Sequence, residues 1–425
     1  MDMSREEQNR RRALRDKRRQ ELKKRRQRQW FTVLGVVAVL VLGIGIIAFS
    51  MLHLQQDQPE QTTPAPQPSS PNVQQPEGEK TVITVTAGGD VNVTDKVIAA
   101  GRTELGFDFT GMFSDILPAL AQSDLTILNF EGVQHGSTFG TSSAAAPKEL
   151  LQALDQAGVD MLQTANSCSI SGGVAGLKQT IASVKESGME PVGTFTDSAA
   201  FKESGGYTFW EINGVRVAVV AFTKGMNGMG LPEGSEDCVN LLYTDYHGTY
   251  QTVDTAGITK VLKNVRKAKP DITIALLHWG SEYNDQISKT QNTIRNLLLE
   301  NGVNVILGTH SHHVQQIIQD PATGSFTAYS LGDFVGDGSR GGTQYSVLLH
   351  LQITKDHTTG ITSVTGYDYT PIYLHDQTAT GGGLRLLRIR EAMDAYENGF
   401  VGRVSKDTYE KMQSALTLAE NRLKG

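Results

Sequence analysis

The chain has 425 residues, of which 39% are hydrophobic and 20% are charged. This is an ordinary globular composition, which excludes a chain without a hydrophobic core and leaves room for one large domain or two modest ones. The net charge of -6 hides an asymmetry, because residues 1–30 carry 13 Lys and Arg against 5 Asp and Glu. The remaining residues carry 26 against 40, so two regions of opposite charge share one chain.

An uncharged run from Phe31 to Leu52 follows the basic segment. Its 22 residues would form a helix about 33 Å long, which is enough to cross a hydrocarbon core of about 30 Å. A secretory signal peptide is the alternative, but its apolar region would span only about 7 to 15 residues before a cleavage site. The sequence therefore predicts a transmembrane helix over residues 30–52.

The charges around this span predict its orientation. Thirteen Lys and Arg precede it, and none occurs between it and Lys80. The positive-inside rule therefore predicts a protein that crosses the cell membrane once. Residues 1–29 form its cytoplasmic tail, and the large C-terminal part is extracytoplasmic. Such a tail could instead bind nucleic acid, but its place beside the membrane favours contact with anionic lipid, so we expect no nucleic-acid partner.

Residues 53–80 contain six Pro, many Gln and almost no apolar side chains. Such a segment cannot bury enough surface to fold, and its Pro content favours an extended, semi-stiff conformation. We expect it to be a stalk.

From Thr81 onward, short apolar runs alternate with segments of helical spacing. The runs that predict buried strands are TVITVTA, DLTILNF, VDMLQTA, VRVAVVAF, DITIALL and VNVILG. The segments that predict helices between them are MFSDILPALAQS, PKELLQALDQAG, GVAGLKQTIASVKESG, ITKVLKNVRKAK and TQNTIRNLLLENG. This alternation predicts an α/β layered domain over residues 81–375.

The later runs lack helices between them, so we expect antiparallel strands in a mixed sheet or sandwich for FTAYSLGDF, QYSVLLHLQIT and ITSVTGYDYTPIYL. The C-terminal segment 376–425 contains two amphipathic patterns, which predict two helices that pack on the domain.

Polar residues follow many of the predicted strands, where open α/β sheets place their ligands. They are Asp90, Asn129, Glu131, Asn166, Cys168, His278, Glu282, His310, His312, His313 and Asp333. Carboxylate and amide oxygens bind hard divalent ions, and imidazole extends the set to manganese, iron and zinc. Alone, Asp90 could cap a helix, but His310 and His312 share one side of a GTHSH turn and could approach one ion. The residue types predict metal or phosphate chemistry at this rim.

The order of these motifs resembles the poly-gamma-glutamate capsule synthesis (CapA) family. The motifs are GGD, N-x-E, AN-x-x before a glycine-rich helix start, HWG-x-E, G-x-H-x-H-x-x-Q and SLG-x-F, within residues 81–375. The resemblance implies a calcineurin-like layered metallophosphatase fold, in which mixed sheets are flanked by helices. It also implies a membrane-anchored protein that helps to make or export a capsule polymer, with proteins of that machinery as partners.

The resemblance also implies roles for residues around a divalent manganese, iron or zinc ion. The metal ligands would be Asp90, Glu131, His310 and His312. Catalytic roles would fall to His278 and Asn166, and an anionic polymer or phosphorylated substrate would meet Asn129, Trp279, Glu282 and Asp333.

The chain departs from the family at two positions. Where the family usually reads ANNH with an Asp three residues later, this chain reads ANSC and then Ser171, so Cys168 replaces a histidine. The family's SLGNF is SLGDF here, with Asp333 in place of an amide. These changes predict either an altered metal preference or a domain that binds without catalysis.

Cys168 has one possible cysteine partner in the chain, Cys238. Because both are expected outside the cytoplasm, we predict a disulfide between them that pins the loop of Cys238 over the site. The alternatives are two unrelated buried cysteines, or a thiolate metal ligand at Cys168.

Three functions remain open from the sequence. The first is a metal-dependent hydrolase or transferase for a cell-envelope substrate, and the second is a non-catalytic scaffold that binds polymer or partners. The third is a sensor or scaffold that uses the basic tail.

Overall fold

The structure is a computed structural model that describes residues 79–380, 382–400 and 404–425. The predicted cytoplasmic tail, the predicted transmembrane helix and all but the last two residues of the predicted stalk lie outside this part. Among the helices of the described residues, none is long and apolar enough to cross a membrane.

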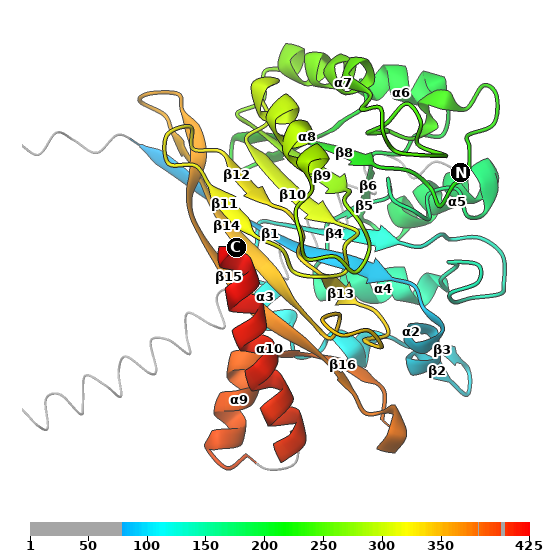
Figure 1. Cartoon of the computed structure of the whole chain (residues 1–425), viewed down its shortest axis with the longest axis vertical. Helices are drawn as coiled ribbons and strands as arrows, with labels where there is room; N and C mark the ends of the chain where they lie inside the picture. The colour runs from blue at the N-terminus through cyan, green and yellow to red at the C-terminus, as the bar shows by residue number, and fades with distance from the viewer. Residues whose placement is uncertain (1–78, 381, 401–403) are drawn as a thin grey trace, which may run out of the picture. The chain divides into compact units, whose positions relative to one another are not determined.

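Eight strands form the first sheet, in the order β16-β15-β14-β1-β4-β5-β6, with β13 beside β1 (Figure 1). Their bounds are β1 (Lys80–Asn92), β4 (Leu125–Glu131), β5 (Met161–Gln163), β6 (Glu190–Val192), β13 (Asp333–Val335), β14 (Tyr345–Asp356), β15 (Thr362–Asp376) and β16 (Leu384–Arg388). The strands β1, β4, β5 and β6 pair in parallel, and β13 is parallel to β1. Because β14, β15 and β16 join antiparallel, the sheet is mixed, as predicted.

The second sheet has six strands in the order β11-β12-β10-β9-β8-β7. Their bounds are β7 (Thr208–Ile212), β8 (Val215–Thr223), β9 (Ile272–His278), β10 (Val305–Thr309), β11 (Ile317–Gln319) and β12 (Phe326–Ala328). The four central strands run parallel, and β7 and β11 are antiparallel edges. A separate hairpin is formed by β2 (Arg102–Thr103) and β3 (Gly106–Phe107).

Several helices of the described residues begin or end at sequence signals. Their bounds are α2 (Asp95–Ala100), α3 (Leu117–Leu120), α4 (Lys148–Ala157), α5 (Gly173–Glu186), α6 (Ser198–Ser204), α7 (Thr255–Ala268), α8 (Lys289–Glu300), α9 (Ile389–Glu397) and α10 (Lys406–Lys424), with short 3-10 turns η1 (Thr110–Phe113), η2 (Glu236–Cys238) and η3 (Thr378–Thr380). Ser288 and Gln291 form a capping box at the start of α8. Gly158 ends α4 in a left-handed conformation, which glycine adopts without a steric penalty.

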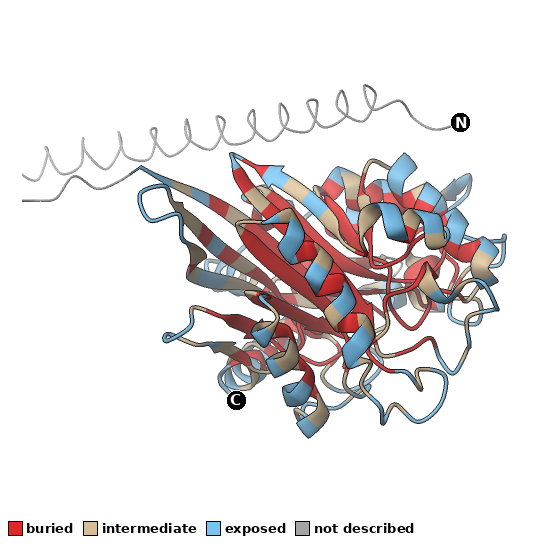
Figure 2. Ribbon diagram, turned by 90° about the horizontal axis from the view of Figure 1, so that it is seen from above, coloured by how far each residue is buried: buried red, intermediate tan, exposed pale blue. Residues whose placement is uncertain are grey.

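The two sheets pack face to face, and helices cover their outer faces (Figure 2). In β8, Val217 and Val219 point into the core between the sheets, whereas Val220 packs outward against α7 and α8. On the other side, α4 covers the first sheet through Leu150 and Leu154. Strands that are buried on both faces explain the continuous apolar runs of the sequence, and the predicted α/β class with mixed sheets is confirmed.

Two predicted elements differ in the structure. The segment MFSDILPALAQS forms only η1 and the short α3, because Pro118 lacks an amide hydrogen and clashes with a preceding turn, so it can only lie near the start of a helix. The segment FTAYSLGDF was expected to be antiparallel, and β12 does pair antiparallel with β11, but β12 also pairs in parallel with β10, and β13 pairs in parallel with β1. The chain therefore passes from one sheet to the other within this segment.

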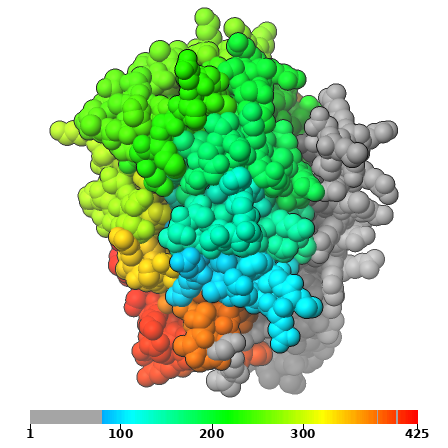
Figure 3. Space-filling view, turned by 90° about the vertical axis from the view of Figure 1, so that its right-hand side faces the viewer, coloured from blue at the N-terminus to red at the C-terminus, as the bar shows by residue number. Residues whose placement is uncertain are grey.

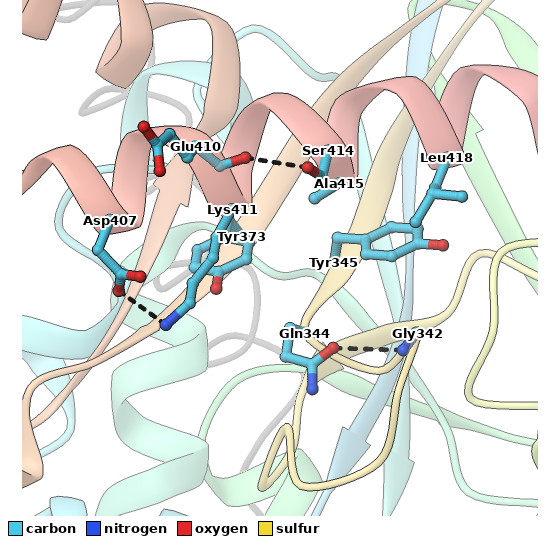
Figure 4. Close-up of a pocket in the computed structure, with 10 residues that line it drawn as sticks. All are labelled: Gly342, Gln344, Tyr345, Tyr373, Asp407, Glu410, Lys411, Ser414, Ala415 and Leu418. Atoms are coloured by element: carbon cyan, nitrogen blue, oxygen red, sulfur yellow. Dashed lines mark hydrogen bonds and ion pairs between the residues drawn. The ribbon is translucent and has the colours of Figure 1, made fainter.

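The C-terminal segment packs on the domain as expected, with Met412 and Ala419 of α10 buried in the central core. In Figure 3 the red C-terminal segment lies beside the orange segment that carries β15 and β16. A pocket remains between α10 and the first sheet, and its wall includes Tyr345, Tyr373 and Lys411 (Figure 4).

The closest approach between β1 and the loop before β13 depends on glycine. A Cβ added at Gly89 would lie 1.7 Å from the carbonyl oxygen of Gly332. Because this neighbour is backbone, we expect Gly89→Ala to lower the free energy of unfolding by about 3 kcal/mol or more, measured by urea titration. The control is Gly111→Ala, since a Cβ there meets no heavy atom within 4 Å. Equal stability of the two variants would contradict this prediction.

Candidate metal centre

The strand ends of both sheets bring the predicted polar residues together. Asp90 lies in β1 and Glu131 ends β4 of the first sheet, while His278 ends β9 of the second. His278 Nε2 lies 3.4 Å from a Glu131 oxygen, and His278 Nδ1 lies 3.9 Å from an Asp90 oxygen. The side chains thus meet across the two sheets, at the edge where parallel strands end.

Glu131, His278 and His310 form a first group that could hold a metal ion, with one ligand atom from each residue within 4.8 Å of the others. The rings of His278 and His310 are 4.4 Å apart. All three residues are buried, yet Glu131 Oε2 and His310 Nδ1 have no hydrogen-bond partner. Buried polar atoms are normally satisfied, so these two orphaned ligand atoms fit a bound cation.

Asp90, His312 and Asp333 form a second group of the same kind. His312 Nδ1 lies 2.7 Å from an Asp333 oxygen and 3.8 Å from Asp90 Oδ2. His310 and His312 thus fall in different groups, with their ring centroids 6.4 Å apart, and the expectation that both approach one ion stays a prediction. Asp333, predicted to contact substrate, lies among the candidate metal ligands.

The backbone at the two histidines is strained. The φ angle is 89° at His310 and 57° at His312, values that residues other than glycine rarely adopt. The strand before them, β10, also needs a glycine, since a Cβ at Gly308 would lie 1.9 Å from the carbonyl oxygen of Tyr329. Strain of this kind concentrates at functional sites, and here it aims neighbouring histidines at two groups.

Asp90 is held between the two groups by hydrogen bonds. The amide of Asn129 donates to Asp90 Oδ1 at 2.6 Å, and the backbone N–H of His310 donates to Asp90 Oδ2 at 3.1 Å. Asn166 in turn donates to Asn129 Oδ1 at 3.1 Å and to the carbonyl of Phe130 at 2.6 Å. Asn166 was predicted to be catalytic, but its side-chain amide donates both of these hydrogen bonds within the protein and positions Asn129.

The charges of the first group suit a metal site. Burial opposes ionisation of Glu131, but His278 outweighs it, so the pKa of this carboxyl lies below its ordinary value. Burial and then the neighbouring His278 hold the pKa of His310 well below its ordinary value. At neutral pH the group therefore offers a carboxylate and a neutral imidazole, the forms that bind metal.

In the second group the carboxyls are harder to ionise. Burial raises the pKa of Asp90, and the charge of Glu131 adds to this effect. Burial also raises the pKa of Asp333 to about 7. Burial disfavours the charged form of His312, but Asp333 outweighs it and raises the pKa of this histidine to about 11. At neutral pH the imidazolium of His312 offsets the charge of these carboxyls, and it must lose its proton to bind a metal ion.

Comparison with known proteins identifies the family of this chain. The model of the family described as bacterial capsule synthesis protein PGA_cap matches residues 84–338, which is more than half of the chain. The chain belongs to the PGA_cap family. The predicted resemblance to CapA proteins is confirmed.

Two relatives carry the name CapA. The chain is 27% identical over 295 residues to the capsule biosynthesis protein CapA of Bacillus anthracis, covering 68% of this chain and 67% of that protein. It is 25% identical over 275 residues to the PGA biosynthesis protein CapA of Bacillus subtilis (strain 168), covering 63% and 66%. The match thus spans about two thirds of each relative's length.

Solved structures with similar folds are more distant. A novel phosphatase of Mycoplasma pneumoniae is 18% identical with a TM-score of 0.42, over 71% of this chain and 98% of that chain. A calcineurin-like phosphoesterase of Bacillus subtilis is 14% identical with a TM-score of 0.43, over 79% and 100%. At this distance the likeness does not identify the chemistry.

Ser167, within the segment where this chain departs from the usual PGA_cap sequence, joins two members of the first group. Its hydroxyl donates to Glu131 Oε1 at 2.8 Å and lies 2.6 Å from His278 Nε2. We expect Ser167→Ala to weaken metal binding roughly 10- to 100-fold, as losses of such supporting hydrogen bonds do. Titration of the metal-free protein with manganese measures this, with Ser171→Ala as the control. Equal affinity of wild type and Ser167→Ala would contradict the prediction.

The two cysteines are both buried and free, so the predicted disulfide between Cys168 and Cys238 is wrong. They lie in different surroundings. The backbone N–H of Cys168 donates to Asn166 Oδ1 at 3.0 Å beside the centre, whereas the backbone carbonyl of Cys238 accepts from Phe195 at 2.8 Å. Burial and the charge of Glu131 raise the pKa of the Cys168 thiol, and Cys168 belongs to neither ligand group.

The predicted substrate residues divide between core and surface. Trp279 was predicted to line the rim, but its side chain is buried in the core. It stacks on Tyr329 and donates its indole N–H to the carbonyl of that residue at 2.9 Å. Glu282 is exposed, as a rim residue should be. Asn129 is buried and bonded to Asp90.

The sequence reasoning missed several residues at the centre. Thr309 Oγ1 lies 3.1 Å from His278 Nδ1, and the ring of Tyr283 stacks on His312 at 5.0 Å. Lys224 follows β8, and its backbone N–H donates to the carbonyl of His278 at 2.8 Å. Lys224 had a usable signal, since it is a polar residue two positions after the predicted strand VRVAVVAF. Tyr283 had no such signal in the sequence, because its position depends on the turn after β9.

Proposed function

We propose that this protein is a membrane-anchored, extracytoplasmic CapA-like protein of capsule or exopolymer biosynthesis, of the poly-gamma-glutamate type, whose metal centre hydrolyses a phosphorylated envelope substrate. Membership of the PGA_cap family and the names of the two Bacillus relatives support the process. The uncharged run from Phe31 to Leu52 supports the anchor. Proteins that synthesise or export the polymer are the partners that fit such a location.

The observation that carries the hydrolase proposal is the pair of adjacent buried ligand groups. Glu131, His278 and His310 would hold one ion, and the second group would hold another. A divalent ion in such a site lowers the pKa of a bound water and stabilises charge on a phosphoryl oxygen. The chain itself positions these ligands, through Ser167 on the first group and Asn129 on Asp90.

A second function is favoured by one residue. Cys168 stands where the family usually has a histidine, and its buried thiol has a raised pKa. A neutral thiol cannot replace an imidazole as a proton donor at neutral pH. A scaffold that binds polymer or partners through its metal centre, without turnover, is therefore the alternative.

Hydrolysis of bis(p-nitrophenyl) phosphate by the full-length protein, loaded with manganese, iron or zinc, separates the two. The hydrolase proposal predicts metal-dependent turnover that His278→Ala abolishes and that His350→Ala, in β14 and outside both ligand groups, leaves unchanged. Metal binding without turnover would favour the scaffold, and absence of metal binding would overturn the metal centre itself.

A further inference from the structure

Three side chains form a stack that leads outward from the second ligand group. The ring of Tyr283 lies 5.0 Å from the ring of His312 at an interplanar angle of 23°. The guanidinium carbon of Arg340 lies 3.9 Å from the centroid of Tyr283 on this stack. His312 is buried, Tyr283 is half-buried and Arg340 is exposed, so the stack runs from the metal centre to solvent.

The guanidinium of Arg340 is free to bind a ligand. Within the described part of the chain, it has neither a hydrogen bond nor an ion pair, whereas Arg385 and Arg390 are each paired with a carboxylate. Stacking on an aromatic ring fixes the plane of a guanidinium without using its donors. All five N–H donors of Arg340 therefore remain available.

The turn that carries Arg340 is held in place by several hydrogen bonds. The Arg340 carbonyl accepts from Thr343 Oγ1 at 2.8 Å and from Gln344 Nε2 at 3.0 Å. Gln344 Oε1 also accepts from the backbone N–H of Gly342 at 3.2 Å, which Figure 4 shows at the wall of the pocket. His313 Nε2 lies 3.0 Å from the carbonyl of Gly341. The position of Arg340 beside the centre is thus built into the fold.

A second cation lies at the other ligand group. The ammonium of Lys224 donates to the carbonyl of Gly280 at 2.7 Å and lies 4.6 Å from the ring of Tyr250. Because Lys224 directly follows β8 and its backbone bonds His278, it lies on the side of the first group. Lys224 and Arg340 therefore flank the two groups, an arrangement that fits a substrate with more than one negative charge.

We propose that Arg340 binds a second anionic group, a phosphate or a carboxylate, on a substrate whose phosphoryl group occupies the metal centre. This inference rests on the proposed function and specifies its substrate as a polyanion. The planar fork of arginine matches either oxyanion through two parallel hydrogen bonds. The steps of 5.0 and 3.9 Å along the stack require a spacer of several bonds between the two anionic groups.

The test compares two phosphonates in calorimetric titrations of the manganese-loaded full-length protein. Methylphosphonate has one anionic group, and 6-phosphonohexanoate adds a carboxylate on a flexible spacer. We expect wild type to bind the second about tenfold more tightly, the gain of a charge-assisted hydrogen-bonded pair. Arg340→Ala should lose this gain without weaker binding of methylphosphonate, and Arg340→Lys should keep part of it.

The matched control is Arg102→Ala, since Arg102 is also exposed and stacked, 5.1 Å over the ring of Phe107, but on the β2–β3 hairpin. It should keep the full gain. If Arg340→Ala also keeps the gain, or if wild type shows no gain, the inference about Arg340 is wrong. Binding of methylphosphonate would in that case still support the proposed metal centre. If neither phosphonate binds, the proposed function fails and this inference fails with it.

Discussion

Full-length protein equilibrated with manganese is expected to hold about two ions per chain, whereas the His310→Ala and His312→Ala variants each hold about one. The reason is that the two histidines serve different groups, one with Glu131 and His278 and the other with Asp90 and Asp333. Removal of either imidazole leaves two ligands in its own group and three in the other. Elemental mass spectrometry of the purified proteins measures the metal content.

The control for this experiment lies in the same turn. His313 belongs to neither group, and its Nε2 faces the carbonyl of Gly341. His313→Ala should therefore retain both ions. Loss of all metal from either single variant would mean that the two groups form one inseparable site. A wild type without metal would contradict the assignment of both groups.

The layered fold was predictable because burial leaves a direct record in the sequence. VRVAVVAF and DITIALL are apolar at nearly every position, and β8 and β9 are indeed buried on both faces. Pro118 shows the opposite case. Its neighbours have helical spacing, but one missing amide hydrogen and one steric clash leave only short turns there.

The membership of the site was predictable for a different reason. Parallel strands present their carboxyl ends at one edge, so Asp90, Glu131 and His278 could be brought together from their positions after apolar runs. The division of His310 and His312 between two groups could not be foreseen. It depends on positive φ angles at both residues, which no spacing rule predicts.

Trp279 and the cysteines show where motif position misleads. Trp279 follows His278 directly, but its side chain lies in the core and bonds the backbone of Tyr329. Cys168 and Cys238 are the two cysteines of the chain, yet one lies beside the metal centre and the other beside Phe195. A count of cysteines alone does not show whether their side chains meet in the geometry that a disulfide requires.

Cys168→His is expected to raise turnover of a phosphodiester with a poor leaving group, such as diphenyl phosphate, by about 100-fold or more, the range of general acid catalysis. Burial and the charge of Glu131 keep the Cys168 thiol protonated, so it cannot exchange protons near neutral pH. An imidazole at the same place can exchange protons near neutral pH. Bis(p-nitrophenyl) phosphate should gain far less, because its leaving group departs without a proton.

The ratio of these two rates separates chemistry from structure. A change that only alters packing or metal affinity would move both substrates together, whereas a new proton donor affects mainly the poor leaving group. Cys168→Asn controls for the larger side chain, whose insertion costs roughly 1 to 3 kcal/mol in a packed core. Cys238→Ser controls for loss of a thiol elsewhere. If Cys168→His retains its metal but gains nothing with diphenyl phosphate, this position does not face the leaving group, and the polymer-binding scaffold becomes the better account of the protein.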